Sequence, residues 1–193
     1  MSKNQSKTKT LVMLGLLTAI VVVLQLLGSF IKFGAFSVSL VLIPIVVGSA
    51  IYGWKGGGWL GFVFGVTVLI SGDAAAFLTV NVIGTIITVL LKGAVAGVCT
   101  GLVYDLLKNK NDTLAVAVSA IVCPIVNTGI FILGCLLFFM DTITSWAEGA
   151  GYSENLGKYI IVGLVGVNFL LEMGINVILS PAVVRIINIK KKI

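Results

Sequence analysis

Long, almost uninterrupted apolar runs dominate the chain between residues 11 and 187. A bilayer core of about 30 Å needs roughly 20 mostly apolar residues per helix, and helices satisfy their own backbone groups where no water is present. The pattern therefore predicts an all-α integral membrane protein with six transmembrane helices. Short polar or glycine-rich segments place these helices at residues 11–28, 36–52, 59–70, 77–107, 114–139 and 159–187.

Composition supports this class. Hydrophobic residues make up 59% of the chain and charged residues 10%, against about 25% charged residues in a soluble domain. No polar stretch is long enough for a second unit, so we expect a single transmembrane domain over residues 1–193, in contact with the lipid bilayer. The net charge of +6 comes from short clusters beside apolar runs and not from one basic face, which excludes a nucleic-acid partner.

The distribution of Lys and Arg predicts the orientation, because short cytoplasmic loops carry the excess of these residues. With six helices, only Lys32 and Lys158 fall on one face, and Lys92 lies within a span. We therefore expect both termini on the opposite, cytoplasmic face. The cations on that face are Lys3, Lys7, Lys9, Lys55, Lys108, Lys110, Arg185, Lys190, Lys191 and Lys192.

The first apolar run follows three lysines, which is also the pattern of a secretory signal. Signal cores are roughly 7–15 residues long and end at a small-residue cleavage site, whereas residues 11–28 form a longer run. This length favours a retained first helix.

Ionisable residues inside a membrane span are costly and usually face a cavity or the interior of the bundle. If each residue adds 1.5 Å of rise along the helix, Lys92 and Glu172 both lie near the middle of their predicted spans. Asn127 lies at a similar depth in residues 114–139. Three spans therefore contribute polar groups to one layer, which predicts a ligand pocket.

Further polar residues extend this predicted pocket. Asn168, Glu172 and Asn176 recur at a spacing of four, which places them on one helix face. An amide nearer the outer mouth comes from Asn81, and Trp146, in the long outward loop 141–158, is a candidate cover. The predicted substrate-binding residues are Asn81, Lys92, Asn127, Trp146, Asn168 and Glu172.

A structural alternative stays open for these residues. Lys92 and Glu172 could form a buried pair, with the asparagines only holding helices together. Trp146 could equally anchor the chain at the membrane interface.

Small residues form stripes on the first three predicted helices. Gly15 and Ala19 are four residues apart, as are Gly57, Gly61 and Gly65. Such stripes let helices approach closely. The sequence favours neither packing within the subunit nor docking of a partner.

Catalytic and metal chemistry have little support. The chain contains no histidine, and its three cysteines lie inside apolar runs without metal-ligand spacing. No nucleophile–base set and no phosphate-binding P-loop are present, and Asp73 is interpreted as a turn or N-cap residue. We expect no enzyme activity, no metal site and no cofactor.

Several short segments occur in an order that resembles the S component of an energy-coupling factor (ECF) transporter, the substrate-binding membrane subunit of a bacterial vitamin importer. The resemblance covers the whole chain. The segments are residues 43–48 (IPIVVG), 52–57 (YGWKGG), 91–97 (LKGAVAG), 124–129 (PIVNTG) and 168–172 (NFLLE).

This resemblance implies a multi-pass protein of the bacterial plasma membrane that captures a vitamin from outside. It also implies partners, namely a membrane T component and two cytoplasmic ATPases. The family docks through an Ala-x-x-x-Ala motif on its first helix, which corresponds here to Gly15 and Ala19. Lys92 favours an anionic vitamin, with pantothenate first and riboflavin, folate or pyridoxine-like compounds next.

Two other functions stay open as alternatives to a vitamin-binding subunit. They are a stand-alone small-solute carrier or channel and a membrane scaffold protein. Secondary carriers are often built from internal repeats, and the sequence shows no such repeat.

Overall fold

The computed structural model describes residues 3–30, 32–33, 36–37 and 39–192, nearly all of them helical. Residues 31, 34, 35 and 38, which belong to the predicted first loop and second helix, lie outside the described residues. A short antiparallel hairpin connects the first two helices. The elements are α1 (Lys3–Gly28), β1 (Lys32–Phe33), β2 (Phe36–Ser37), α2 (Leu42–Ser71), α3 (Ala75–Leu78), α4 (Val82–Leu107), α5 (Asp112–Phe138), α6 (Met140–Gly149), α7 (Leu156–Lys158), the π-helix η1 (Tyr159–Leu164) and α8 (Gly166–Lys192).

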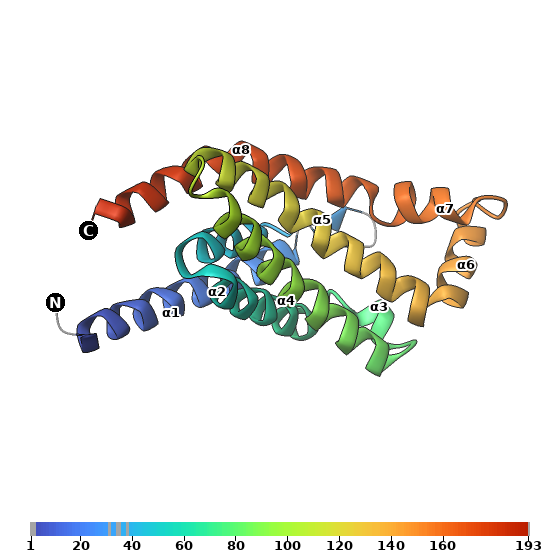
Figure 1. Cartoon of the computed structure of the whole chain (residues 1–193). Coiled ribbons are helices and arrows are strands. Elements are labelled where there is room, and N and C mark those ends of the chain that lie inside the picture. The colour runs from blue at the N-terminus through green and yellow to red at the C-terminus, as the bar shows by residue number, and fades with distance from the viewer. Residues whose placement is uncertain (1–2, 31, 34–35, 38, 193) are drawn as a thin grey trace.

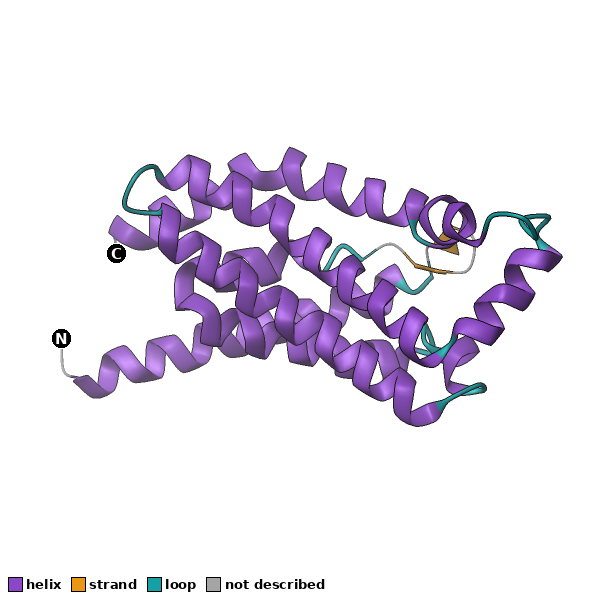
Figure 2. Ribbon diagram, turned by 45° about the vertical axis from the view of Figure 1, so that its right-hand side comes forward, coloured by secondary structure: helices purple, strands orange, loops and turns teal. Residues whose placement is uncertain are grey.

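Four helices in the described part of the chain are long and apolar enough to cross a membrane. They lie at Lys7–Gly28, Val82–Leu107, Asp112–Phe138 and Gly166–Ile189. They run roughly along one long axis, and both termini lie at the same end of the bundle, opposite α6 and α7 (Figure 1, Figure 2). The helical membrane class expected from the apolar pattern is confirmed.

The helix α2 is broken at Gly53, which has φ 68° and ψ −168°. This backbone region is accessible essentially only to glycine. After the break the chain folds back, so that Gly48 lies against Leu60. The predicted helices 36–52 and 59–70 thus correspond to the two halves of α2. The turn expected over residues 53–58 is confined to one residue, and the first half begins only at Leu42, because the hairpin precedes it.

Two other predicted spans are subdivided. Residues 77–107 contain the end of α3 and all of α4, which are separate because the side chain of Asn81 accepts the Gly84 N–H at 2.9 Å and caps α4. Residues 159–187 begin as the π-helix η1, and α8 follows from Gly166. The outward loop predicted over residues 141–158 contains the amphipathic helix α6.

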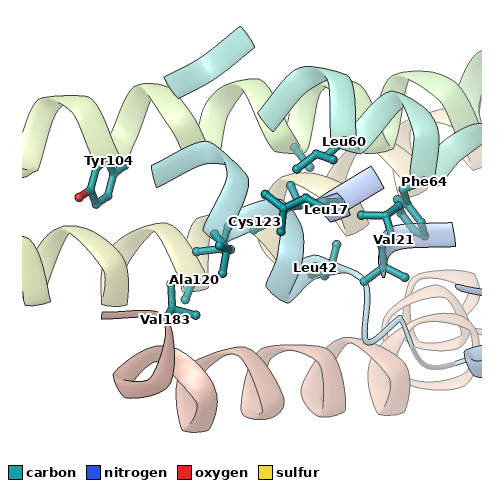
Figure 3. Close-up of a cluster of buried hydrophobic side chains, with 14 of the residues drawn as sticks. Leu17, Val21, Leu42, Leu60, Phe64, Tyr104, Ala120, Cys123 and Val183 are labelled. Atoms are coloured by element: carbon teal, nitrogen blue, oxygen red, sulfur yellow. The ribbon is translucent and has the colours of Figure 1, made fainter. Parts of the chain in front are cut away.

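Glycines let α2 and α4 approach closely. A Cβ atom on Gly57 would meet the backbone of Gly97, and one on Gly61 would meet that of Gly93. Gly57, Gly61 and Gly65 therefore pack within the subunit, which resolves the alternative that the sequence left open for them. Beside this seam, side chains from α1, α2, α4, α5 and α8 form the buried apolar core (Figure 3).

Candidate ligand-binding site

A cavity of about 80 Å³ lies between α1, α4, α5 and α8, next to the connection that follows α2. One water molecule needs roughly 10–15 Å³ of cavity volume, so this cavity has room for several waters or a small solute. Apolar and aromatic side chains form much of its wall. Its polar lining residues are Gln25, Ser39, Asp73, Lys92, Asn127, Thr128, Asn168 and Glu172.

Lys92 projects from α4 into this cavity. Its Nζ lies 5.5 Å from the ring centroid of Phe64 and 5.3 Å from that of Phe131. Both rings are within the range of a cation–π contact, which holds an ammonium group without neutralising it. Lys92 and Glu172 interact electrostatically but, within the described part of the chain, do not form a salt bridge. The alternative of a closed buried pair is therefore not seen between these two described residues, and Lys92 lines the cavity.

Glu172 is on α8 and is only 6% exposed. Its Oε1 accepts the backbone N–H of Ser39 at 3.2 Å, which ties the segment before α2 to the cavity wall. The amide of Asn176 donates to the backbone carbonyl of Glu172 at 2.8 Å. Of the stripe spaced by four residues, Asn168 and Glu172 therefore face the cavity, whereas Asn176 bonds to its own helix.

Two asparagines present buried acceptors that have no partner among the described residues. These are the Oδ1 atoms of Asn127 on α5 and Asn168 on α8. Both side chains line the cavity, and Asn127 is only 4% exposed. Buried polar atoms are nearly always hydrogen-bonded, and an unpaired one costs about 1–3 kcal/mol. Both amide oxygens can therefore still accept a hydrogen bond from a donor.

Two residues that line the cavity, Gln25 and Asp73, were not predicted as binding residues. Gln25, on α1 and 2% exposed, donates from Nε2 to Oδ2 of Asp73 at 2.6 Å, and both residues line the cavity. Asp73 lies in a turn, in agreement with its interpretation as a turn or N-cap residue, and Ala74 occupies the N-cap of α3. The signal for Gln25 was available, since it is a polar residue inside an apolar run.

Asn81 and Trp146 do not line the cavity. The carbonyl oxygen of the Asn81 side chain is engaged as the cap of α4. Trp146, on α6, packs edge-on against Phe77 with ring centroids 5.5 Å apart, and Phe77 forms part of the cavity wall. Trp146 thus lies one layer behind the wall.

The two predicted docking residues lie elsewhere. Gly15 and Ala19 are exposed on α1, and nothing lies within 4 Å of a Cβ placed on Gly15.

An apolar helical bundle that encloses a cation and unpaired amide acceptors defines a membrane-embedded solute-binding protein. Comparison with known proteins gives a narrower assignment. The family model described as "ECF transporter, substrate-specific component" matches residues 9–184, and the chain belongs to this family. It is accordingly a multi-pass protein of the bacterial plasma membrane and a substrate-binding component of a transporter, which is not itself an enzyme.

A curated relative has a more specific description. The chain is 30% identical over 198 residues to "Pantothenic acid transporter PanT" of Lactococcus lactis subsp. cremoris (strain MG1363), and the match covers 94% of both proteins. No solved structure matches the chain. The resemblance seen in the short sequence segments is confirmed.

Proposed function

We propose that this chain is the pantothenate-binding subunit of an ECF-type importer. A membrane T component and two cytoplasmic ATPases supply the energy, since the chain has no P-loop of its own. The description of the Lactococcus relative supports pantothenate as the ligand. The observation that carries the proposal is the cavity, where one lysine and two unpaired amide oxygens converge from three helices.

The chemistry of pantothenate fits these groups. The molecule has a carboxylate at one end, an amide in the middle and two hydroxyl groups beside a dimethyl carbon at the other end. Lys92 binds the carboxylate as a point charge. Asn127 and Asn168 accept hydrogen bonds from the ligand N–H and O–H groups. Phe77 and Phe131 cover the apolar carbon atoms.

The proposal includes six spans with both termini in the cytoplasm. Support comes from the reversal of the chain at Gly53, from the shared end of the two termini, and from the lysines that cluster near that end. The cavity then opens toward the side of α6 and α7, from which the vitamin enters. Gly15 and Ala19 form the proposed docking surface for the partner module, because both are exposed on α1.

Isothermal titration of the purified chain in lipid nanodiscs, without ATP, tests this function. Pantothenate should bind with a stoichiometry of one, and riboflavin, folate and pyridoxine should bind far more weakly. Tighter binding of any of these three would contradict the proposed substrate. No binding of any vitamin would contradict the solute-binding role itself.

A further inference from the structure

Gln25 is the cavity residue that α1 contributes. Leu17 and Val21 lie two turns and one turn before it on the same face of the helix, and both belong to the apolar core (Figure 3). Gln25 continues this face, is only 2% exposed and lines the cavity. A buried amide is costly unless its polar atoms are hydrogen-bonded, so this position in an apolar helix needs polar partners.

One partner of Gln25 is the carboxylate of Asp73. Its Nε2 donates to Oδ2 of Asp73 at 2.6 Å. A carboxylate only accepts hydrogen bonds, so the NH₂ side of the amide must face Asp73 and the carbonyl oxygen must face away from it. A primary amide has two N–H groups and two acceptor lone pairs, and the bond to Asp73 uses one of these positions. Gln25 can thus act as both donor and acceptor toward a group in the cavity.

The hydrogen-bond donors of the proposed ligand call for a further acceptor. Pantothenate has three donors, which are one amide N–H and two hydroxyl groups. The open amide oxygens of Asn127 and Asn168 can take two of them. A hydroxyl group also accepts a hydrogen bond, so the partner that satisfies it fully must offer an acceptor and a donor together. A side-chain amide offers both, whereas the carboxylates of Asp73 and Glu172 only accept.

The placement of Gln25 relative to Lys92 selects the end of the ligand. Lys92 reaches the cavity from α4 and lies beside Phe131 of α5, whereas Gln25 reaches it from α1. Both α1 and α4 pack against α2, so the two side chains enter from different walls. In pantothenate the terminal hydroxyl group lies at the end of the molecule opposite the carboxylate.

We propose that Gln25 binds the terminal hydroxyl group of pantothenate, and that Asp73 is a positioning residue that orients the Gln25 amide. This inference rests on the proposed function, in which Lys92 binds the carboxylate. The hydroxyl donates to Oε1 of Gln25 and accepts from its second N–H. The competing explanation is structural, namely that Gln25 only fastens α1 to the turn after α2.

A cycle of two proteins and two ligands separates these explanations. Isothermal titration in nanodiscs compares pantothenate with an analogue that has hydrogen in place of the terminal hydroxyl. The wild type should bind the analogue about 5- to 150-fold more weakly, because a buried amide loses its partner. In Gln25→Met, which keeps an unbranched chain of similar length, both ligands should bind equally. If Gln25→Met weakens both ligands by the same factor and keeps the wild-type ratio, the structural explanation holds and the inference is overturned.

Two other variants guard against a folding defect. Gln25→Asn draws the amide back by one methylene group and keeps its polarity, so it should lose the discrimination even if Gln25→Met does not fold. Thr18→Val is the control on the same helix, because the Thr18 hydroxyl donates to the Leu14 carbonyl at 2.8 Å and lies outside the cavity lining. It should keep the wild-type ratio. Full discrimination in folded Gln25→Asn would contradict the assignment.

The positioning role of Asp73 is measured with the same ratio. Asp73→Ala removes the acceptor that orients Gln25 and should lose much of the discrimination, whereas Asp73→Asn keeps an acceptor there and should retain more of it. Full discrimination in Asp73→Ala would overturn the positioning role.

The ligands also distinguish failure of the inference from failure of the proposed function. Equal binding of pantothenate and the analogue by the wild type overturns the inference alone. An analogue without the secondary hydroxyl should lose affinity equally in wild type and Gln25→Met. If its loss, and not that of the terminal analogue, disappears in Gln25→Met, the assignment to the terminal hydroxyl is wrong. No binding of pantothenate by the wild type overturns the proposed function as well.

Discussion

Gly61 of α2 and Gly93 of α4 face each other so closely that a methyl group on either would meet the backbone of the other. This contact brings α4 against the second half of α2 and, with it, places Lys92, the residue before Gly93, beside Phe64 and the cavity. The position of the cation thus depends on the packing of backbone against backbone.

The substitution Gly61→Ala should therefore destabilise the protein. The added methyl group cannot be accommodated by moving a flexible side chain, because its neighbours are backbone atoms, and such overpacking typically costs about 1–3 kcal/mol. Thermal melting in detergent should show a lower midpoint. Gly174→Ala is the matched control, since nothing lies within 4 Å of its Cβ, and its midpoint should stay the same or rise. Equal melting of both variants would contradict the close contact.

The substitution Lys92→Met should weaken pantothenate binding without unfolding the protein. Methionine keeps an unbranched stem of similar length against Phe64 and Phe131 but cannot bind a carboxylate. The loss of a charge-assisted hydrogen bond, worth about 1.5–3 kcal/mol, predicts a fall in affinity of about 10- to 150-fold. Lys108→Met serves as the control, because Lys108 pairs with Asp105 on the surface at 2.6 Å. Titration of both variants should show a loss for Lys92→Met alone.

The substitution Asn127→Leu should separate stability from binding. Leucine has the same branching and the same number of heavy atoms, and it removes an acceptor that is buried without a partner, so the ligand-free protein should melt at the same or a higher temperature. The affinity for pantothenate should fall by about 2- to 13-fold, which corresponds to the loss of one ordinary hydrogen bond of about 0.5–1.5 kcal/mol. A variant that melts earlier and binds normally would show that Asn127 has a structural role.

Asn81→Ala should show the opposite signature. It removes the cap of α4 and should cost about 1 kcal/mol of stability, while the affinity stays unchanged because Asn81 lies outside the cavity wall. If the fully folded variant bound pantothenate more weakly than the wild type, the direct binding role predicted for Asn81 would be supported after all.

Bulky side chains on the exposed stripe of α1 should block assembly and leave ligand binding intact. The double substitution Gly15→Leu and Ala19→Leu places side chains where a partner helix would approach closely. Co-purification with the T component and ATPases should be lost, while titration with pantothenate gives the wild-type affinity. Met13→Leu, also exposed on α1 but on a different face of the helix from Gly15 and Ala19, is the control and should co-purify normally.

Much of the site could be predicted from the sequence because charges and amides inside apolar runs are conspicuous. Lys92, Asn127, Asn168 and Glu172 were identified by the cost of burying polar groups in a membrane, and all four line the cavity. Depth along a helix is a local property, so 1.5 Å of rise per residue was sufficient to align them.

The remaining residues depend on contacts that a sequence does not display. Asp73 follows a glycine in a short polar segment typical of turns, and only the fold brings it to Gln25 on α1. The side chain of Asn81 accepts the backbone N–H of Gly84, so its oxygen is engaged within the helix end and not in the cavity. The break in α2 could be expected from its glycines, but its position at Gly53 depends on which glycine takes the positive φ.

The most direct test of the central claim is to identify the molecule that the protein retains. The chain should be purified under mild conditions from cells supplied with pantothenate, and the small molecules released on denaturation should be quantified by mass spectrometry. The wild type should release pantothenate in a ratio approaching one per chain, and Lys92→Met, prepared in parallel, should release little. A different vitamin from the wild type, or equal retention by the folded Lys92→Met variant, would contradict a pantothenate site built around Lys92.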